Sequence, residues 1–108
     1  MNWVCIDKSF LCSLISSLIY TVMDKRILEL RQQIDMLDEE IILLLKKRMG
    51  ISKEVGKLKE ELEIPVEDKN RENEIIDRLT QQAGRNLSEQ QLIRIFTAVF
   101  KSSKQVQK

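Results

Sequence analysis

One apolar series runs through the middle of the chain at alternating spacings of three and four residues. Its members are Ile27, Leu30, Ile34, Leu37, Ile41, Leu44, Ile51, Val55 and Leu58. This periodicity predicts one long α-helix from about Asp24 to about Glu61. Position 48 lies on the same face but holds an arginine, and burying a guanidinium without an anionic partner costs several kcal/mol. We therefore expect a carboxylate of the protein or an anionic ligand to meet Arg48.

A helix of about 35 residues is roughly 50 Å long, whereas a domain of this size is only about 25–30 Å across. The helix is thus predicted to extend beyond its own fold, where a second subunit would cover its apolar face. Gly50 and Gly56 lie inside it, and each costs up to about 1 kcal/mol. A close helix contact or a ligand near the backbone would explain them; simple tolerance in a well-packed helix is the alternative.

A second helix is predicted after a loop at residues 63–67, because Pro65 ends the first. It runs from about Asp68 to Ala83, and Gly84 is suited to its C-terminal end. The positions expected to face inward are Ile75, Ile76 and Leu79.

A third helix is predicted from the capping-box pattern of Ser88 and Gln91. Its apolar seam consists of Leu92, Phe96, Val99 and Val106. No strand pattern occurs in the sequence, so we expect an all-α fold with three helices and a very long first one.

Composition separates the first 22 residues from the rest. They hold both cysteines, the only Trp and the only Tyr, and their only charges are Asp7 and Lys8. From Met23 onward the chain carries 17 basic and 16 acidic residues, which argues against general nucleic-acid binding. That part contains no His or Cys, which excludes a histidine base, a thiolate nucleophile and a Cys/His zinc site. Any catalysis there must use positioning and electrostatic stabilisation.

Residues 1–22 are interpreted as an apolar leader upstream of the true start at Met23. The apolar stretch at residues 9–22 is too short to span a membrane, so stable insertion is not expected. An export signal and a membrane-associating arm are alternatives, but the preceding segment has no net positive charge and no small-x-small cleavage site precedes Met23. We expect a domain at residues 23–108 and a cytoplasmic location, with export as the alternative.

Cations on the first helix share a face with Arg48. Lys59 is eleven residues away, which places it about 20° around the helix and roughly 16 Å along it. Ser52 lies between them. Arg31 is seventeen residues from Arg48, or roughly 25 Å, so it is expected to serve a partner chain's site rather than its own.

The two later helices contribute polar groups at spacings of four residues. Asp68 and Glu72 face the same way beside Arg71, and Ser103 and Gln107 repeat the arrangement. Together with the cations, this set suits a small dianion that also carries a hydroxyl.

Each of these residues also has a structural interpretation without a ligand. Arg48 could pair only with Glu72, and Asp68 could serve as a helix N-cap. Lys59 and Arg31 could be solvated charges beside the seam. Residues 103 and 107 could belong to a frayed end.

Three stretches carry a family resemblance: LRQQIDMLDEEIILLLKKRMGISKEVGKLK, IPVEDKNRENEII and IFTAVFKSSKQVQ. They resemble the all-helical chorismate mutases over nearly all of residues 26–107. The resemblance implies an intertwined helical homodimer with two active sites, each built from both chains. It also implies the pericyclic rearrangement of chorismate to prephenate in aromatic amino-acid biosynthesis, with no cofactor and no metal.

The resemblance further assigns roles by position. Lys59 and Gln107 would donate to the ether oxygen, while Arg48 and Arg31 of the partner subunit would hold the two substrate carboxylates. The remaining binding roles go to Glu72 and the backbone near Asp68, for the ring hydroxyl, and to Ser103 and Arg71, for the ring carboxylate. Isochorismate pyruvate lyase activity on the same fold and a non-enzymatic helical dimerisation module are alternatives. The hydroxyl role of Glu72 favours the mutase.

Overall fold

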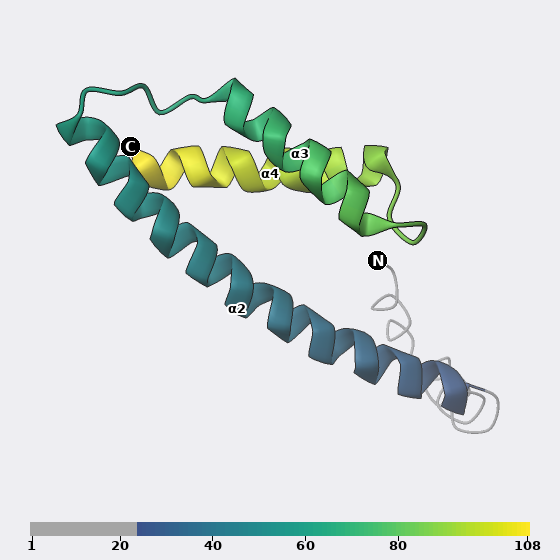
Figure 1. Ribbon diagram of the computed structural model, residues 1–108. Helices are drawn as coiled ribbons and strands as arrows, with labels where there is room; N and C mark the ends of the chain where they lie inside the picture. Colours follow the sequence, from purple (N-terminus) through teal and green to yellow (C-terminus); the bar gives the residue numbers. More distant parts are fainter. Residues whose placement is uncertain (1–23) are drawn as a thin grey trace, which may run out of the picture. The chain divides into compact units, whose positions relative to one another are not determined.

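Three α-helices make up the computed structural model, which describes residues 24–108 (Figure 1). They are α2 (Lys25–Glu61), α3 (Lys69–Ala83) and α4 (Glu89–Gln107). No strand occurs within residues 24–108, so the predicted all-α fold with a very long first helix is confirmed. The chain divides into two compact units, Met1–Ile42 and Leu43–Lys108, and α2 contributes to both. The apolar leader predicted at residues 1–22 lies outside the described residues.

The C-terminal end of α2 is closed by a pair of backbone hydrogen bonds. The amide of Ile64 donates to the carbonyl of Lys59 at 2.8 Å, and the amide of Glu63 donates to the carbonyl of Glu60 at 3.2 Å. These bonds form a Schellman motif, which needs a left-handed residue after the helix. Glu63 takes that conformation with φ 56°. The helix therefore ends before Pro65 is reached, and the proline only prevents it from resuming.

The starts of α3 and α4 are fixed by side-chain caps. The Asp68 carboxylate accepts a hydrogen bond from the Arg71 amide at 3.0 Å. Ser88 and Gln91 form both halves of the predicted capping box, at 2.9 and 3.1 Å. Gly84 follows α3 with φ 70°. The predicted bounds of α3 and the predicted start of α4 are thus confirmed, because they depend on local hydrogen bonds that the sequence displays.

The apolar core of the second unit lies where α3 and α4 run side by side (Figure 1). Its buried side chains are Ile75, Leu92, Val99 and Phe100. Phe96 packs against Phe100 with ring centroids 5.8 Å apart. Val106, expected on the same seam, is instead 37% exposed. Each seven-residue step along a helix falls about 20° short of two full turns. Val106 lies two such steps after Leu92, so its side chain has rotated away from the buried face that begins at Leu92.

The apolar series on α2 is exposed in the single chain. Its nine members keep between 38% and 64% of their surface, with Val55 the least exposed and Leu44 the most. This long face is therefore open to another apolar surface. Among the described helices, none combines the length and the apolar character needed to cross a membrane.

Candidate active site

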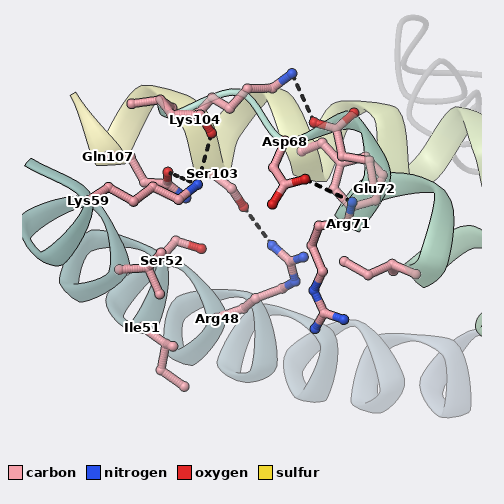
Figure 2. A pocket seen from close by; sticks show the side chains of 14 residues that line it. Arg48, Ile51, Ser52, Lys59, Asp68, Arg71, Glu72, Ser103, Lys104 and Gln107 are labelled. Carbon is pink, nitrogen blue, oxygen red and sulfur yellow. Dashed lines mark hydrogen bonds and ion pairs between the residues drawn. The ribbon is translucent and has the colours of Figure 1, made fainter. Parts of the chain in front are cut away.

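A cavity of about 490 Å³ in the second unit collects most of the predicted site residues. Its walls come from α2, from the loop before α3, from α3 and from α4 (Figure 2). Seven of the eight predicted residues line it, namely Arg48, Lys59, Asp68, Arg71, Glu72, Ser103 and Gln107. Arg31 belongs to the first unit, and its role in a partner's site stays a prediction.

Arg48 is half-buried at the α2 wall, and the groups that it contacts directly, Ser103 and Phe100, are neutral. Its Nη1 donates to Ser103 Oγ at 2.5 Å, and its guanidinium lies 5.9 Å from the centre of the Phe100 ring. Burial, and next the charge of Arg71, lower the pKa of the Arg48 guanidinium. Within residues 24–108, no carboxylate forms an ion pair with it. The interpretation of Arg48 as a partner of Glu72 is therefore wrong.

Lys59 lies on the same face of α2, as the spacing predicted, and reaches two other parts of the chain. Its ammonium donates to the Val66 carbonyl at 2.9 Å and to Gln107 Oε1 at 3.3 Å (Figure 2). Gln107 is half-buried and Ser103 is only 6% exposed, so neither belongs to a frayed end. The last turn of α4 is part of the cavity wall.

A close helix contact brings Gln107 to Lys59. Gly56 is buried, and a Cβ atom added there would lie 2.6 Å from Gln107 Cα and 2.8 Å from its carbonyl oxygen. A Cβ atom essentially never comes within 3.0 Å of a non-bonded backbone atom, so glycine permits an approach of α2 and α4 that a larger residue would block. Among residues 24–108 of the single chain, nothing lies within 4 Å of the corresponding position at Gly50, so no close helix contact explains that glycine there.

The α3 wall carries the carboxylates. Asp68 caps the helix, as its alternative interpretation proposed, and also lines the cavity. Arg71 is exposed and pairs with Glu74 at 3.2 Å. Glu72 pairs with Lys104 on α4 at 3.0 Å and more loosely with Lys69 at 3.8 Å. Within the described residues, no group of three or more acidic, His or Cys side chains is placed to hold a metal ion.

Sequence reasoning missed Phe100 and Lys104, which both line the cavity. A signal was present, since the two residues are spaced four apart on the face of α4 that also carries Ser103. The ion pair between Lys104 and Glu72 could not be read from that spacing, because its partners lie on different helices.

Comparison with known proteins identifies the family. The family model described as chorismate mutase type II matches residues 30–108, which span most of α2 and all of α3 and α4. The chain belongs to this family. The resemblance found in the sequence motifs is thereby confirmed, and the family favours an enzyme over a non-enzymatic dimerisation module.

Relatives of the chorismate mutase family are similar over different lengths. A chorismate mutase of Methanocaldococcus jannaschii is 33% identical over 87 residues, covering 80% of this chain and 88% of the relative. A bifunctional chorismate mutase/prephenate dehydratase of Aquifex aeolicus is 39% identical over 51 residues, which are 47% of this chain and 14% of that protein. A solved structure, a conserved hypothetical protein from Pyrococcus furiosus, superposes with a TM-score of 0.66 at 37% identity and covers 78% of this chain and 97% of that one.

Proposed function

We propose that chorismate binds in the cavity of the second unit and rearranges there to prephenate. Membership of the family makes this chain a chorismate mutase, an enzyme that isomerises chorismate. One observation supports the location: Arg48 and Lys59 line one cavity, and in the described chain neither forms an ion pair with a carboxylate. A dicarboxylate substrate would supply the missing negative charge.

The rearrangement of chorismate needs little acid–base catalysis from the protein. One C–O bond breaks while one C–C bond forms in the same molecule, so no nucleophile and no net proton transfer are needed. The barrier falls when the enolpyruvyl arm is held folded over the ring. It falls further when negative charge developing on the ether oxygen meets fixed hydrogen-bond donors.

Lys59 and Gln107 are the proposed donors to the ether oxygen. An ammonium has three N–H groups, and two of those on Lys59 donate to atoms of the described chain. The third remains for the substrate. The Gln107 carbonyl oxygen accepts from Lys59, so its amide nitrogen is the end left to donate. Both hydrogen bonds would strengthen as charge develops, which raises the rate rather than only the affinity.

The remaining roles concern holding the substrate. Arg48 would bind one carboxylate in a bidentate manner. Its Nη1 donates to Ser103 Oγ, and the other N–H groups of the guanidinium are available for the substrate. Ser103 and Arg71 would support the ring carboxylate. Glu72 and the backbone near Asp68 would accept and donate at the ring hydroxyl.

A homodimer completes the proposal. The exposed apolar face of α2 supports it, because burying this face would gain roughly 25 cal/mol for each Å² removed from water. Arg31 of the partner subunit would then hold the second carboxylate, as the spacing along α2 first suggested.

A cytoplasmic location, expected from the sequence, also stays a prediction. It concerns residues 1–22, which the structure does not describe. Fractionation of cells that express the full chain would test it against export.

The proposal is tested by following chorismate consumption by the full chain, with prephenate identified as the product. Arg48→Ala should lower kcat/KM by about 100-fold or more while the melting temperature is kept. Arg94→Ala, an exposed arginine of α4 outside the cavity lining, is the matched control and should retain activity. A folded wild-type chain that leaves chorismate unchanged would contradict the proposal; pyruvate release from isochorismate would then identify the lyase.

A further inference from the structure

Lys104 on α4 pairs with one carboxylate of α3 and with one of the loop before it. Its ammonium lies 3.0 Å from a carboxylate oxygen of Glu72 and 3.0 Å from one of Glu67 (Figure 2 shows the first contact). The side chains of Lys104 and Glu72 keep only 24% and 18% of their exposure. Because both groups are largely shielded from water, their attraction is stronger than that of a surface pair.

The contact with Lys104 restricts where the Glu72 carboxylate can point. One oxygen is held at 3.0 Å by Lys104, whereas the other is 3.8 Å from Lys69, whose side chain is 72% exposed. The exposed lysine contributes little to orientation. A carboxylate oxygen accepts more than one hydrogen bond, so Glu72 keeps acceptor capacity for a ligand while Lys104 fixes its direction.

The second contact of Lys104 secures the loop before α3. Glu67 accepts from Lys104, and its neighbour Val66 accepts from Lys59. Two successive residues of this loop are therefore each bonded to a lysine that lines the cavity. Asp68, which caps α3, follows directly. Lys104 thus acts on the loop and on the first turn of α3 at the same time.

We propose that Lys104 is a positioning residue that aims the Glu72 carboxylate at the ring hydroxyl of the substrate. It thereby favours a substrate with a hydroxyl at that ring position. This inference rests on the proposed function, because Glu72 is assigned to the hydroxyl there. Lys104 itself need not touch the substrate, and its effect passes through Glu72.

The first test compares Lys104→Met and Lys104→Arg in the full chain, with chorismate as substrate. Loss of the cation should lower kcat/KM by about tenfold. Arginine keeps the charge and should restore most of the activity. Lys101→Met is the matched control, since Lys101 lies one turn earlier on α4, is exposed and does not line the cavity. Activity of Lys104→Met equal to wild type would overturn the proposal.

The second test asks whether Lys104 acts through Glu72. In a Glu72→Gln background, Lys104→Met should change kcat/KM less than twofold, because the carboxylate that it aims is gone. An equal loss in both backgrounds would overturn the proposal and show that Lys104 acts elsewhere. If Lys104→Met does not fold, Lys104→Gln replaces it in the same cycle.

A third arm uses a chorismate analogue that lacks the ring hydroxyl. The penalty of Lys104→Met should disappear with this compound, whereas a merely structural role would leave it unchanged. The activity of the wild-type chain distinguishes failure of the proposed function from failure of the proposed role of Lys104. A wild-type chain without turnover removes the proposed function and this proposal together, whereas active wild type with an unaffected Lys104→Met removes only the latter.

Discussion

The cations of the cavity fall into two groups according to their partners. Arg48 and Lys59 bond to a hydroxyl, a backbone carbonyl and an amide, and no carboxylate of residues 24–108 compensates their positive charge. Lys104 instead meets two carboxylates. The first group is suited to an anionic ligand and the second to holding the protein's own side chains. All three side chains carry the same positive charge, so their different roles follow from the groups that they contact.

Gln107→Glu tests the donor role of Gln107. Near neutral pH the new carboxylate would repel the developing negative charge and occupy Lys59, which now lies 3.3 Å from Gln107 Oε1. A protonated carboxyl could donate as the amide does. We therefore expect activity only toward acid pH, measured as a kcat/KM profile. The wild type serves as the control, and a variant with a flat profile near neutrality would contradict the role.

Glu67 gives the unfolding free energy a pH dependence at the acid end. Hydrogen bonds from Lys104 and then Lys69 lower the pKa of its carboxyl in the folded state. A lowered folded pKa means that the stabilisation is present above the unfolded pKa and is lost as pH falls through the folded value. The melting temperature of wild type should exceed that of Glu67→Gln at neutral pH. The difference should vanish in strong acid; a constant difference would contradict the assignment.

The helices act as rigid supports, and their spacing decides which side chains meet. Gly56 on α2 allows the end of α4 to approach so closely that Lys59 reaches Gln107. The Schellman turn at Glu63 then directs the chain into the loop whose Val66 carbonyl also receives Lys59. Two backbone features therefore place the proposed donors to the ether oxygen.

Gly56→Ala should separate α2 from α4, because the new methyl group would lie 2.6 Å from Gln107 Cα. We expect a loss of about 1–3 kcal/mol in the free energy of unfolding and a lower kcat, as Gln107 moves away. Gly50→Ala is the matched control, since no described residue of the chain lies within 4 Å of its Cβ position. It should stabilise the helix by up to about 1 kcal/mol. Thermal melts and steady-state kinetics of both variants check this, and unchanged kcat in Gly56→Ala would refute it.

At the scale of the whole molecule, one chain leaves its longest apolar face exposed. The series on α2 extends over both compact units, and every member keeps more than a third of its surface. Such a face favours association with a second copy. In the proposed homodimer, Arg31 of the partner subunit would complete the active site, and activity would then require the assembly.

Mixing two inactive variants tests this shared site. If Arg31 acts in the partner's site, a dimer of Arg31→Ala with Arg48→Ala chains contains one intact site and one doubly impaired site. Random exchange of subunits should then restore about one quarter of wild-type activity, because about half of the dimers are mixed. Each variant alone is the control. A mixture as inactive as its components, with exchange shown by mass spectrometry, would place both arginines in one chain's site.

The sequence by itself determined the helices, because periodicity, caps and breakers act through local hydrogen bonds and the burial of one face. It also located the polar positions on those faces, and seven of the eight predicted site residues line one cavity. Only the tertiary structure decided their partners. Arg48 meets Ser103, 55 residues away, and Lys104 meets Glu72 on another helix. These pairings depend on the distance and angle between helices. Close contacts such as that at Gly56 set this geometry, and no local sequence pattern encodes it.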